Sequence, residues 1–183
     1  KGSGEDVYFS CSENFSHRPR FLLAGLVETE FVFIQDDDFC LARPTVFGEL
    51  IALSRTRPDH FLGHRGKVFG EWSDKQKPYQ HSTGWCGEGE ADMANTGNSF
   101  FPARLMNKMP VNPYFEPGNL SKQEYQYGDD MYVSKYQKCY ATELLHKGGM
   151  TALPECGVGV SHHPQHMDIR NMLCLRYWGD KIK

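Results

Sequence analysis

The 183-residue sequence contains no long apolar run, no strong excess of one charge and no close pair of cysteines. No uncharged apolar stretch approaches the roughly 20 residues that a membrane-spanning helix needs, so we expect no transmembrane segment. The 20 basic and 23 acidic residues leave a net charge of −3, which gives no electrostatic basis for binding nucleic acid. The six cysteines form no C-x-x-C pair, and their even number is compatible with an oxidising compartment without establishing one.

The composition is that of an ordinary globular chain, with 39% hydrophobic and 23% charged residues. The length predicts a single domain that covers residues 1–183. The aromatic fraction of 13%, together with 18 glycines and 10 prolines, favours a loop-rich fold.

Strands and helices are expected to alternate along the chain, which is typical of an α/β sheet. The apolar run Phe31-Val-Phe-Ile is rich in β-branched and aromatic residues and predicts a buried central strand. Asp129 is expected to cap a helix that continues to about His146 and stops at Gly148-Gly149. The other expected elements are strands at Asp6–Ser10, Asn98–Phe101 and Gly157–Ser161, short strands near Val68 and Trp85, and helices at Arg20–Val27, from Pro44, at Ala103–Lys108 and ending at Gly179.

Three adjacent aspartates, Asp36, Asp37 and Asp38, follow the apolar strand directly. Open α/β sheets bind ligands beyond the carboxyl ends of their strands, which is where these carboxylates are expected to lie. Carboxylate oxygens suit Mg²⁺ or Mn²⁺, and such a cation would offset the charge of a diphosphate. The alternative is a solvated acidic turn, which the preceding apolar strand makes the less favoured interpretation.

A second acidic pair, Asp129 and Asp130, stands at the head of a predicted helix. Acidic side chains at a helix N-terminus satisfy free N–H groups and the helix dipole, which is a sufficient structural reason for them. One aspartate is enough for that purpose, so the other is free to act as a base, a nucleophile or an orienting group. The pattern alone leaves both interpretations open.

Two further segments carry polar residues that suit a binding site. A polar turn with Asp92, Thr96 and Gly97 leads into an apolar strand, and small residues there let a ligand approach the backbone. Three histidines, including His163 and His166, fall close together without the spacing of a closed zinc site. An ordinary turn and a surface loop are equally good interpretations of these segments.

In order and spacing, these motifs resemble the GT-A glycosyltransferases, most closely the exostosin-like branch that transfers hexosamine-type sugars. The stretch from Asn14 to Phe39 has the family's Asn followed by Arg and Phe, a helix ending in Glu-Thr, an apolar strand and an Asp triplet. The run from Asp92 to Phe100 is similar to its Asp-Met-x-x-Thr-Gly-x-x-Phe segment. Gly128-Asp-Asp-Met resembles its Glu-Asp-Ile turn, and Arg170 to Tyr177 resembles its C-terminal helix.

The resemblance implies a GT-A, Rossmann-like mixed sheet flanked by helices. Few residues precede Asn14, so the strand-helix-strand unit with which this fold normally begins is expected to be short or missing. The implied activity is the metal-dependent transfer of a sugar from a nucleoside diphosphate sugar, of the UDP type, to a hydroxyl of a glycan or glycoprotein acceptor. The implied location is the Golgi lumen for a fragment of an anchored enzyme, and the cytoplasm for a compact soluble or viral enzyme.

The resemblance also implies a role for each matching residue. Asp130, with Asp129 beside it, is expected to be the catalytic carboxylate beneath the anomeric carbon. The acceptor side is expected to include Asp92, Thr96 and Gly97, and the Mn²⁺ or Mg²⁺ ligands are expected to be Asp38, Asp36 and His166. The residues expected to bind the donor nucleotide sugar are Asp36, Asp37, Asp38, Asn14, Arg18, Arg20, Arg170 and His163.

Two other functions fit the same residues. A carbohydrate- or nucleotide-binding module without catalysis would use the same donor site, and the short N-terminal part favours it. A metal-dependent phosphohydrolase would combine the two acidic clusters with the histidines and hold two metals about 3.5–4 Å apart. Turnover of a donor sugar separates the transferase from the module, and the number of bound metals separates it from the phosphohydrolase.

Overall fold

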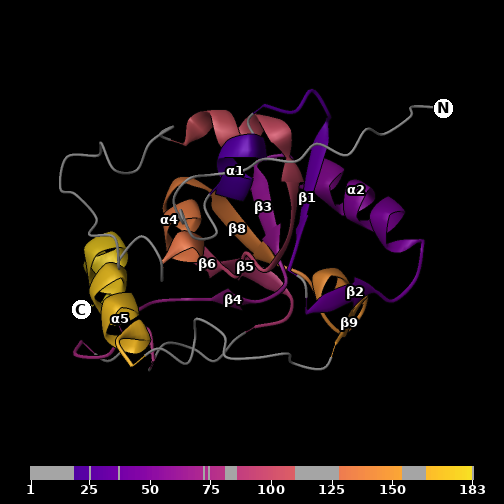
Figure 1. Ribbon diagram of the computed structural model, residues 1–183. Coiled ribbons are helices and arrows are strands. Elements are labelled where there is room, and N and C mark those ends of the chain that lie inside the picture. Colours follow the sequence, from indigo (N-terminus) through magenta and orange to yellow (C-terminus); the bar gives the residue numbers. More distant parts are fainter. Residues whose placement is uncertain are drawn as a thin grey trace.

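The computed structural model describes residues 19–24, 26–36, 38–71, 73, 75–80, 86–109, 128–153 and 164–182. Their central feature is a five-stranded mixed sheet with the strand order β1-β7-β3-β8-β5 (Figure 1). The strands are β1 (Phe31–Gln35), β3 (His60–Gly63), β5 (Gly89–Ala91), β7 (Asn98–Pro102) and β8 (Lys138–Ala141).

The strand directions bring particular strand ends together. β7 lies between β1 and β3 and is antiparallel to both, whereas β3 and β8 are parallel. In the register, Gln35 pairs with Asn98, and Gly63 pairs with Ser99 on one side and Ala141 on the other. β1, β3 and β8 therefore end at the same edge of the sheet, where β7 begins. We call this edge the carboxyl edge.

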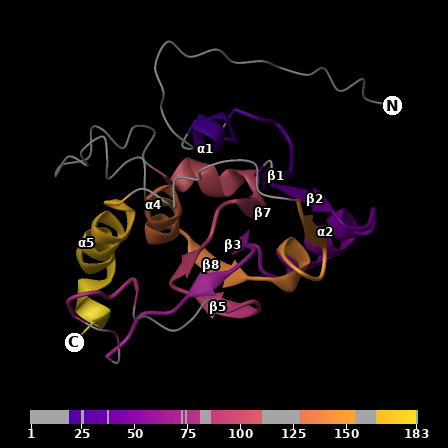
Figure 2. The same ribbon diagram turned by 60° about the horizontal axis from the view of Figure 1, so that its bottom comes forward.

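Helices flank the sheet, which confirms the predicted mixed α/β architecture. Figures 1 and 2 show α2 beside β1, and α4 and α5 toward the opposite side of the molecule. The α-helices are α1 (Pro19–Ala24), α2 (Val46–Thr56), α4 (Asp129–Tyr136) and α5 (His166–Trp178), and the 3₁₀ helices are η1 (Ala103–Lys108), η3 (Glu143–Leu145) and η5 (Gly179–Lys181). Two small sheets pair β2 (Phe39–Leu41) with β9 (Met150–Ala152) and β4 (Gly66–Lys67) with β6 (Met93–Ala94).

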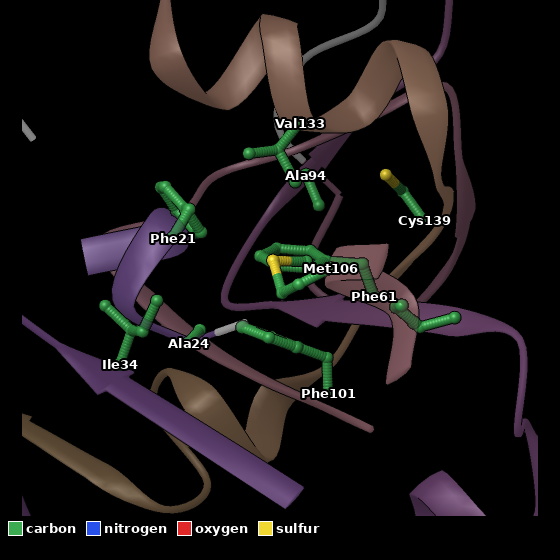
Figure 3. Close-up of a cluster of buried hydrophobic side chains, with 10 residues drawn as sticks. Phe21, Ala24, Ile34, Phe61, Ala94, Phe101, Met106, Val133 and Cys139 are labelled. Carbon is green, nitrogen blue, oxygen red and sulfur yellow. The ribbon is translucent and has the colours of Figure 1, made fainter. Parts of the chain in front are cut away.

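The core has two layers, one on each face of the sheet. Phe61 and Phe101 belong to a layer with residues of α1, η1 and α4, whereas their neighbours Leu62 and Phe100 belong to a layer with residues of α2 and η3. Successive side chains of a strand point to opposite faces, so a strand covered on both faces is apolar at every position. Figure 3 shows the first layer, in which the Phe61 and Phe101 rings stack with their centroids 4.8 Å apart. We call the two faces the α4 face and the α2 face.

A third buried cluster joins α5 to α4. It includes Met131 of α4 and Leu173, Cys174 and Trp178 of α5. The Trp178 ring packs on Phe69 with the two centroids 5.0 Å apart. Neither α5 nor any other helix in the described ranges combines the length and the apolar character needed to cross a membrane.

The apolar run that ends at Ile34 forms a strand as predicted, but among the described strands it does not hold the predicted central position. β1 stands at one end of the described strand order and has β7 as its neighbour. The run is apolar because helix α2 covers this part of the sheet, where Phe33 meets Phe47 of α2 at 5.1 Å between centroids. Phe31 stacks on Phe100 of β7. An apolar strand therefore reports coverage of its faces, not its place in the sheet order.

The predicted helix from Asp129 to His146 is also wrong in length. α4 ends at Tyr136, and Lys138–Ala141 forms β8. Cys139 and Tyr140 enter the two opposite core layers, which requires the alternation of a strand. Pairing with β3 therefore decides the conformation of this segment.

The remaining predicted elements agree with the structure where it describes them. β7, η1 and the end of α5 at Gly179 fall where they were expected, and the expected helix at Arg20–Val27 is the shorter α1. The expected strand near Val68 is β4. The segments Asp6–Ser10 and Gly157–Ser161 and the surroundings of Trp85 lie outside the described residues.

Candidate functional site

Arg20 of α1 joins residues from separate parts of the chain at the carboxyl edge. Its Nη1 donates to Oδ1 of Asp36, directly after β1, at 2.5 Å. Its Nη2 donates to Oδ2 of Asp129, the first residue of α4, at 3.1 Å and to Oγ1 of Thr96 at 3.4 Å. The Thr96 hydroxyl donates to the same Asp129 oxygen at 3.1 Å. Four residues that the sequence predicted for the site thus form one connected group, which we call the charged network.

Gly97 allows the Asp36 carboxylate to lie against the start of β7. A Cβ atom on Gly97 would stand 2.5 Å from Oδ2 of Asp36, closer than real Cβ contacts. The backbone amide of Asp36 donates to the Gly97 carbonyl at 2.8 Å, so the two residues also meet through their main chains. Glycine is therefore required here by the close approach of the Asp36 carboxylate, whereas the sequence predicted the close approach of a ligand to this backbone.

Asp130, the next residue of α4, is held by Arg170 of α5. Arg170 Nη2 donates to Asp130 Oδ2 at 2.5 Å, and the two side chains are only 6% and 7% exposed. The other carboxylate oxygen accepts from the backbone amide of Met131 at 2.8 Å. The two acidic residues at the head of α4 therefore have different partners, Arg20 for Asp129 and Arg170 for Asp130.

Burial is the main influence on the ionisation of this pair. It raises the pKa of the Asp130 carboxyl, the Arg170 guanidinium opposes that rise, and the charge of Asp129 adds to it. Desolvation is the largest single influence on Arg170 and lowers its pKa, but the charges of Asp130, Tyr79 and Asp129 and the hydrogen bond to Asp130 together outweigh it, so the net pKa lies above the ordinary value. Arg170 is thus a permanent buried cation beside a carboxyl whose charge depends on it.

Two further residues near the Asp130–Arg170 pair, Lys67 and Tyr79, were not singled out from the sequence. The Tyr79 ring centroid is 4.2 Å from Cζ of Arg170 and 4.8 Å from Nζ of Lys67, and Lys67 also donates to the Tyr79 carbonyl at 3.0 Å. Burial lowers the pKa of Lys67 and raises that of Tyr79 to about 12. An aromatic face attracts cations, so Tyr79 lets two of them approach each other. The sequence signal was a single lysine within the glycine-rich run Gly66–Gly70.

Asp92, predicted for the acceptor side, joins three segments. Its Oδ2 accepts from the backbone amide of Phe69 at 2.8 Å, and its Oδ1 contacts Nζ of Lys181 in η5. These contacts fix the chain between β5 and β6 and give Asp92 a clear structural role. Its role toward an acceptor stays a prediction.

The acidic residues after β1 fit a cation of the kind that binds phosphates. Asp38 is exposed, and its carboxylate has no partner among the described residues. Phosphate-bound Mg²⁺ is typically held by one or two carboxylates together with oxygens of the substrate. Asp36 and Asp38 can supply the carboxylates. The described part of the chain contains no group of three or more ligating side chains.

His166, the third predicted metal ligand, forms no group of three ligating side chains with these aspartates in the described part of the chain. It is the first residue of α5, which Figures 1 and 2 show on the opposite side of the molecule from β2, the strand after Asp38. The structure brings it instead onto the helix that carries Arg170. The other predicted residues, Asn14, Arg18, Asp37 and His163, lie outside the described residues.

A second polar group occupies the α2 face of the carboxyl edge and was missed from the sequence. His64 directly follows β3, and His146 follows η3 of the α2-face layer. Their rings stack with centroids 5.8 Å apart and an interplanar angle of 21°. Arg65 contacts Nε2 of His146 through Nη2 at 2.7 Å and Nε at 3.2 Å. The available signal was the run His64-Arg65 at the end of an apolar strand, where ligand-binding residues of open sheets occur.

No family model matches the chain, and no curated protein matches it either. Among solved structures, the chain is similar to the crystal structure of A197 from STIV, with 11% sequence identity and a TM-score of 0.39. The alignment covers 79% of this chain and 76% of that one. A likeness this distant identifies no activity.

Proposed function

We propose that the protein is a metal-dependent glycosyltransferase, which moves a sugar from a UDP-type nucleotide sugar to a hydroxyl group of a glycan or glycoprotein acceptor. The observation that supports this most is the contact of Arg20 with both Asp36 and Asp129. Through it, Asp36 after β1 and Asp129 at the head of α4 belong to one group. A transferase needs this convergence, because the diphosphate and the anomeric carbon of a donor are close together.

In this proposal, the charge of the departing nucleoside diphosphate sets the main electrostatic demand on the site. Asp38 and Asp36 would hold Mn²⁺ or Mg²⁺, which neutralises diphosphate charge when it is bound. Arg170 contributes a cation that stays protonated. Asp130 is the carboxylate for the reacting carbon, and its two oxygens are oriented by Arg170 and by the Met131 amide.

A non-catalytic binding module is the second candidate, and one observation favours it. Asp130 is buried and tied to Arg170 rather than open to a ligand. A module of this kind would retain metal-dependent nucleotide binding through Asp36 and Asp38 and would show no transfer. The two candidates therefore share the donor site and differ at Asp130.

Donor binding is tested by measuring the melting temperature with UDP, with and without Mn²⁺, because a ligand that binds only the native state raises it. We expect a rise that requires Mn²⁺ in the wild type and in Asp59→Ala, an exposed residue just before β3 begins. Asp38→Ala should lose the rise. Undiminished UDP binding by Asp38→Ala would refute the proposed donor site.

Catalysis is tested by following the transfer or hydrolysis of UDP-sugars. Asp130→Asn should lower turnover by at least about 100-fold, the scale of a lost acid–base or nucleophilic group, while Mn²⁺-dependent UDP binding persists. Wild-type protein that binds UDP with Mn²⁺ but turns over no donor sugar would establish the binding module instead.

A further inference from the structure

The hydrogen bonds around His64 and His146 fix which ring nitrogen carries the proton. The backbone amide of Asn98 donates to Nδ1 of His64 at 3.3 Å, so the proton of a neutral His64 is on Nε2. Arg65 has only donors and points two of them at Nε2 of His146, so the proton of His146 is on Nδ1. Each imidazole therefore presents one N–H group that does not serve the contacts just described.

Both imidazoles are held in the neutral form. Burial lowers the pKa of His64 to about 4, and the nearby His146 and Arg65 contribute to that fall. Burial likewise lowers the pKa of His146, together with the charges of Arg65 and Lys147, while Glu143 acts in the opposite direction. These are the charged groups that act on the pair from the turn after β3, from η3 and from the turn after η3.

Arg65 is charged but has no carboxylate partner among the described residues. Arg20, Arg43 and Arg170 each reach a carboxylate within 4.0 Å, whereas the described side-chain contacts of Arg65 go to a neutral imidazole. A half-buried guanidinium in this state leaves a positive charge at the carboxyl edge. Charge of this kind attracts an anion from outside the chain.

Three nitrogen atoms of this group have no partner in the described chain: Nη1 of Arg65, Nε2 of His64 and Nδ1 of His146. None of the three is among the buried polar atoms that are sealed from solvent without a partner. The side chain of Asn98, in contrast, is fully buried and has neither its oxygen nor its nitrogen hydrogen-bonded. The three open nitrogen atoms and the buried Asn98 amide thus show that polar groups in this region lack hydrogen-bond partners within the described chain.

We propose that Arg65, His64 and His146 form a binding site for an oxyanion, a phosphate or carboxylate group, on the α2 face of the carboxyl edge. A guanidinium provides the planar donor geometry that such groups prefer, and the two imidazole N–H groups add further donors. The site is on the other face of the sheet from the charged network. It does not depend on the proposed transferase activity, because it uses none of the residues assigned to donor or catalysis.

Binding of an anion at this site is coupled to protonation of the histidines. A negative charge beside an imidazole favours its charged form, so bound anion raises the pKa of both His64 and His146. By linkage, lowering the pH strengthens anion binding over the pH range in which the histidines become protonated. This coupling separates the proposed site from a bare surface arginine, whose affinity for anions would not follow histidine titration.

The test uses inorganic phosphate as the probe and the histidine ring signals in NMR spectra as the readout. Phosphate titrated into the wild type should shift the His64 and His146 signals saturably and raise the pKa of both. Arg65→Gln should weaken phosphate binding by about 10-fold or more, the scale of a lost charge-assisted bond. Arg65→Lys keeps the charge but not the planar guanidinium. Its affinity for phosphate should therefore lie between those of the wild type and Arg65→Gln.

The matched control is Arg55→Gln, which removes an exposed arginine of α2 and should bind phosphate as the wild type does. Unchanged amide spectra away from the site would show that each variant is folded. Equal phosphate shifts in the wild type and Arg65→Gln, or shifts that never saturate, would overturn the proposal. Phosphate binding that survives Asp38→Ala and Asp130→Asn would separate this site from the proposed function.

Two competitors identify the source of the oxyanion. Displacement of phosphate by UDP without metal would assign the site to a nucleotide, and displacement by a sugar acid would assign it to an acidic sugar. Either result supports the site. Failure of phosphate itself to reach these histidines refutes it.

Discussion

On the α4 face of the carboxyl edge, Arg20 and Arg170 are each neutralised by carboxylates, whereas on the α2 face Arg65 contacts a neutral imidazole. Both groups include residues that lie within a few positions of a strand end of the same sheet. Their place in the sheet therefore does not explain the difference in how the arginines are paired. The difference lies in the nearby acids, since the α4 face receives Asp129 and Asp130 from the head of α4. One edge of a sheet can therefore hold both a site whose charges neutralise one another and a site with an unpaired positive charge.

The largest effect is expected from a substitution that removes a buried charge on the α4 face. Arg170→Met leaves Asp130 buried without its cation, and breaking such a pair by removing one partner costs roughly 3–5 kcal/mol. Arg55→Met breaks a pair with Glu30 whose side chains are 64% and 63% exposed, and it should cost only about 0–1 kcal/mol. Urea unfolding of both variants measures the contrast. Similar losses in the two variants would show that burial does not distinguish these pairs.

A second test concerns the open side and its response to acid. His64 has a folded-state pKa of about 4, below the ordinary value of 6.5, so between these pH values the unfolded chain binds more protons. The free energy of unfolding should therefore fall as the pH falls from about 6.5 to 4, by roughly 3 kcal/mol from this group. His64→Gln should remove that part of the pH dependence. Parallel stability curves for the two proteins between these pH values would contradict the assignment.

The smallest expected effects come from two glycines with opposite surroundings. Gly97→Ala places a Cβ against the Asp36 carboxylate and should destabilise the protein by about 1–3 kcal/mol, the usual cost of overpacking. Gly48→Ala, within α2, meets no atom within 4 Å and should stabilise it by about 0.5–1 kcal/mol. Thermal unfolding of the pair gives the sign of each change. If Gly97→Ala were stabilising, the tight approach of Asp36 to β7 would be wrong.

Residues of the neutralised side were singled out from the sequence, whereas those of the open side were not. Asp36, Thr96 and Asp129 were singled out because each belongs to a short motif after or before a regular element, and Arg20 connects them. His64 and His146 belong to no motif. They meet because β3 and β8 are parallel neighbours, and pairing between distant strands has no local signal.

The error in the Asp129 helix has a related cause. Its first turn is strongly marked by acidic residues, but nothing local marks its end at Tyr136 before the short strand β8. β8 becomes a strand through pairing with β3 and β5 and through burial of Cys139 and Tyr140 on opposite faces. Local preference thus located the residues of the site, and tertiary contacts decided the elements between them.

The ladder between β1 and β7 has a consequence for how the two faces stay distinct. β1 has β7 as its described neighbour in the sheet, and their register ends with Gln35 opposite Asn98. A slip of one residue would turn every side chain of β1 to the opposite face. It would carry the Asp36 carboxylate away from Arg20 and toward the α2 face, which holds the histidines and Arg65. The register of a single strand pair therefore decides on which face of the sheet the Asp36 carboxylate lies, and so keeps one sheet edge chemically two-sided.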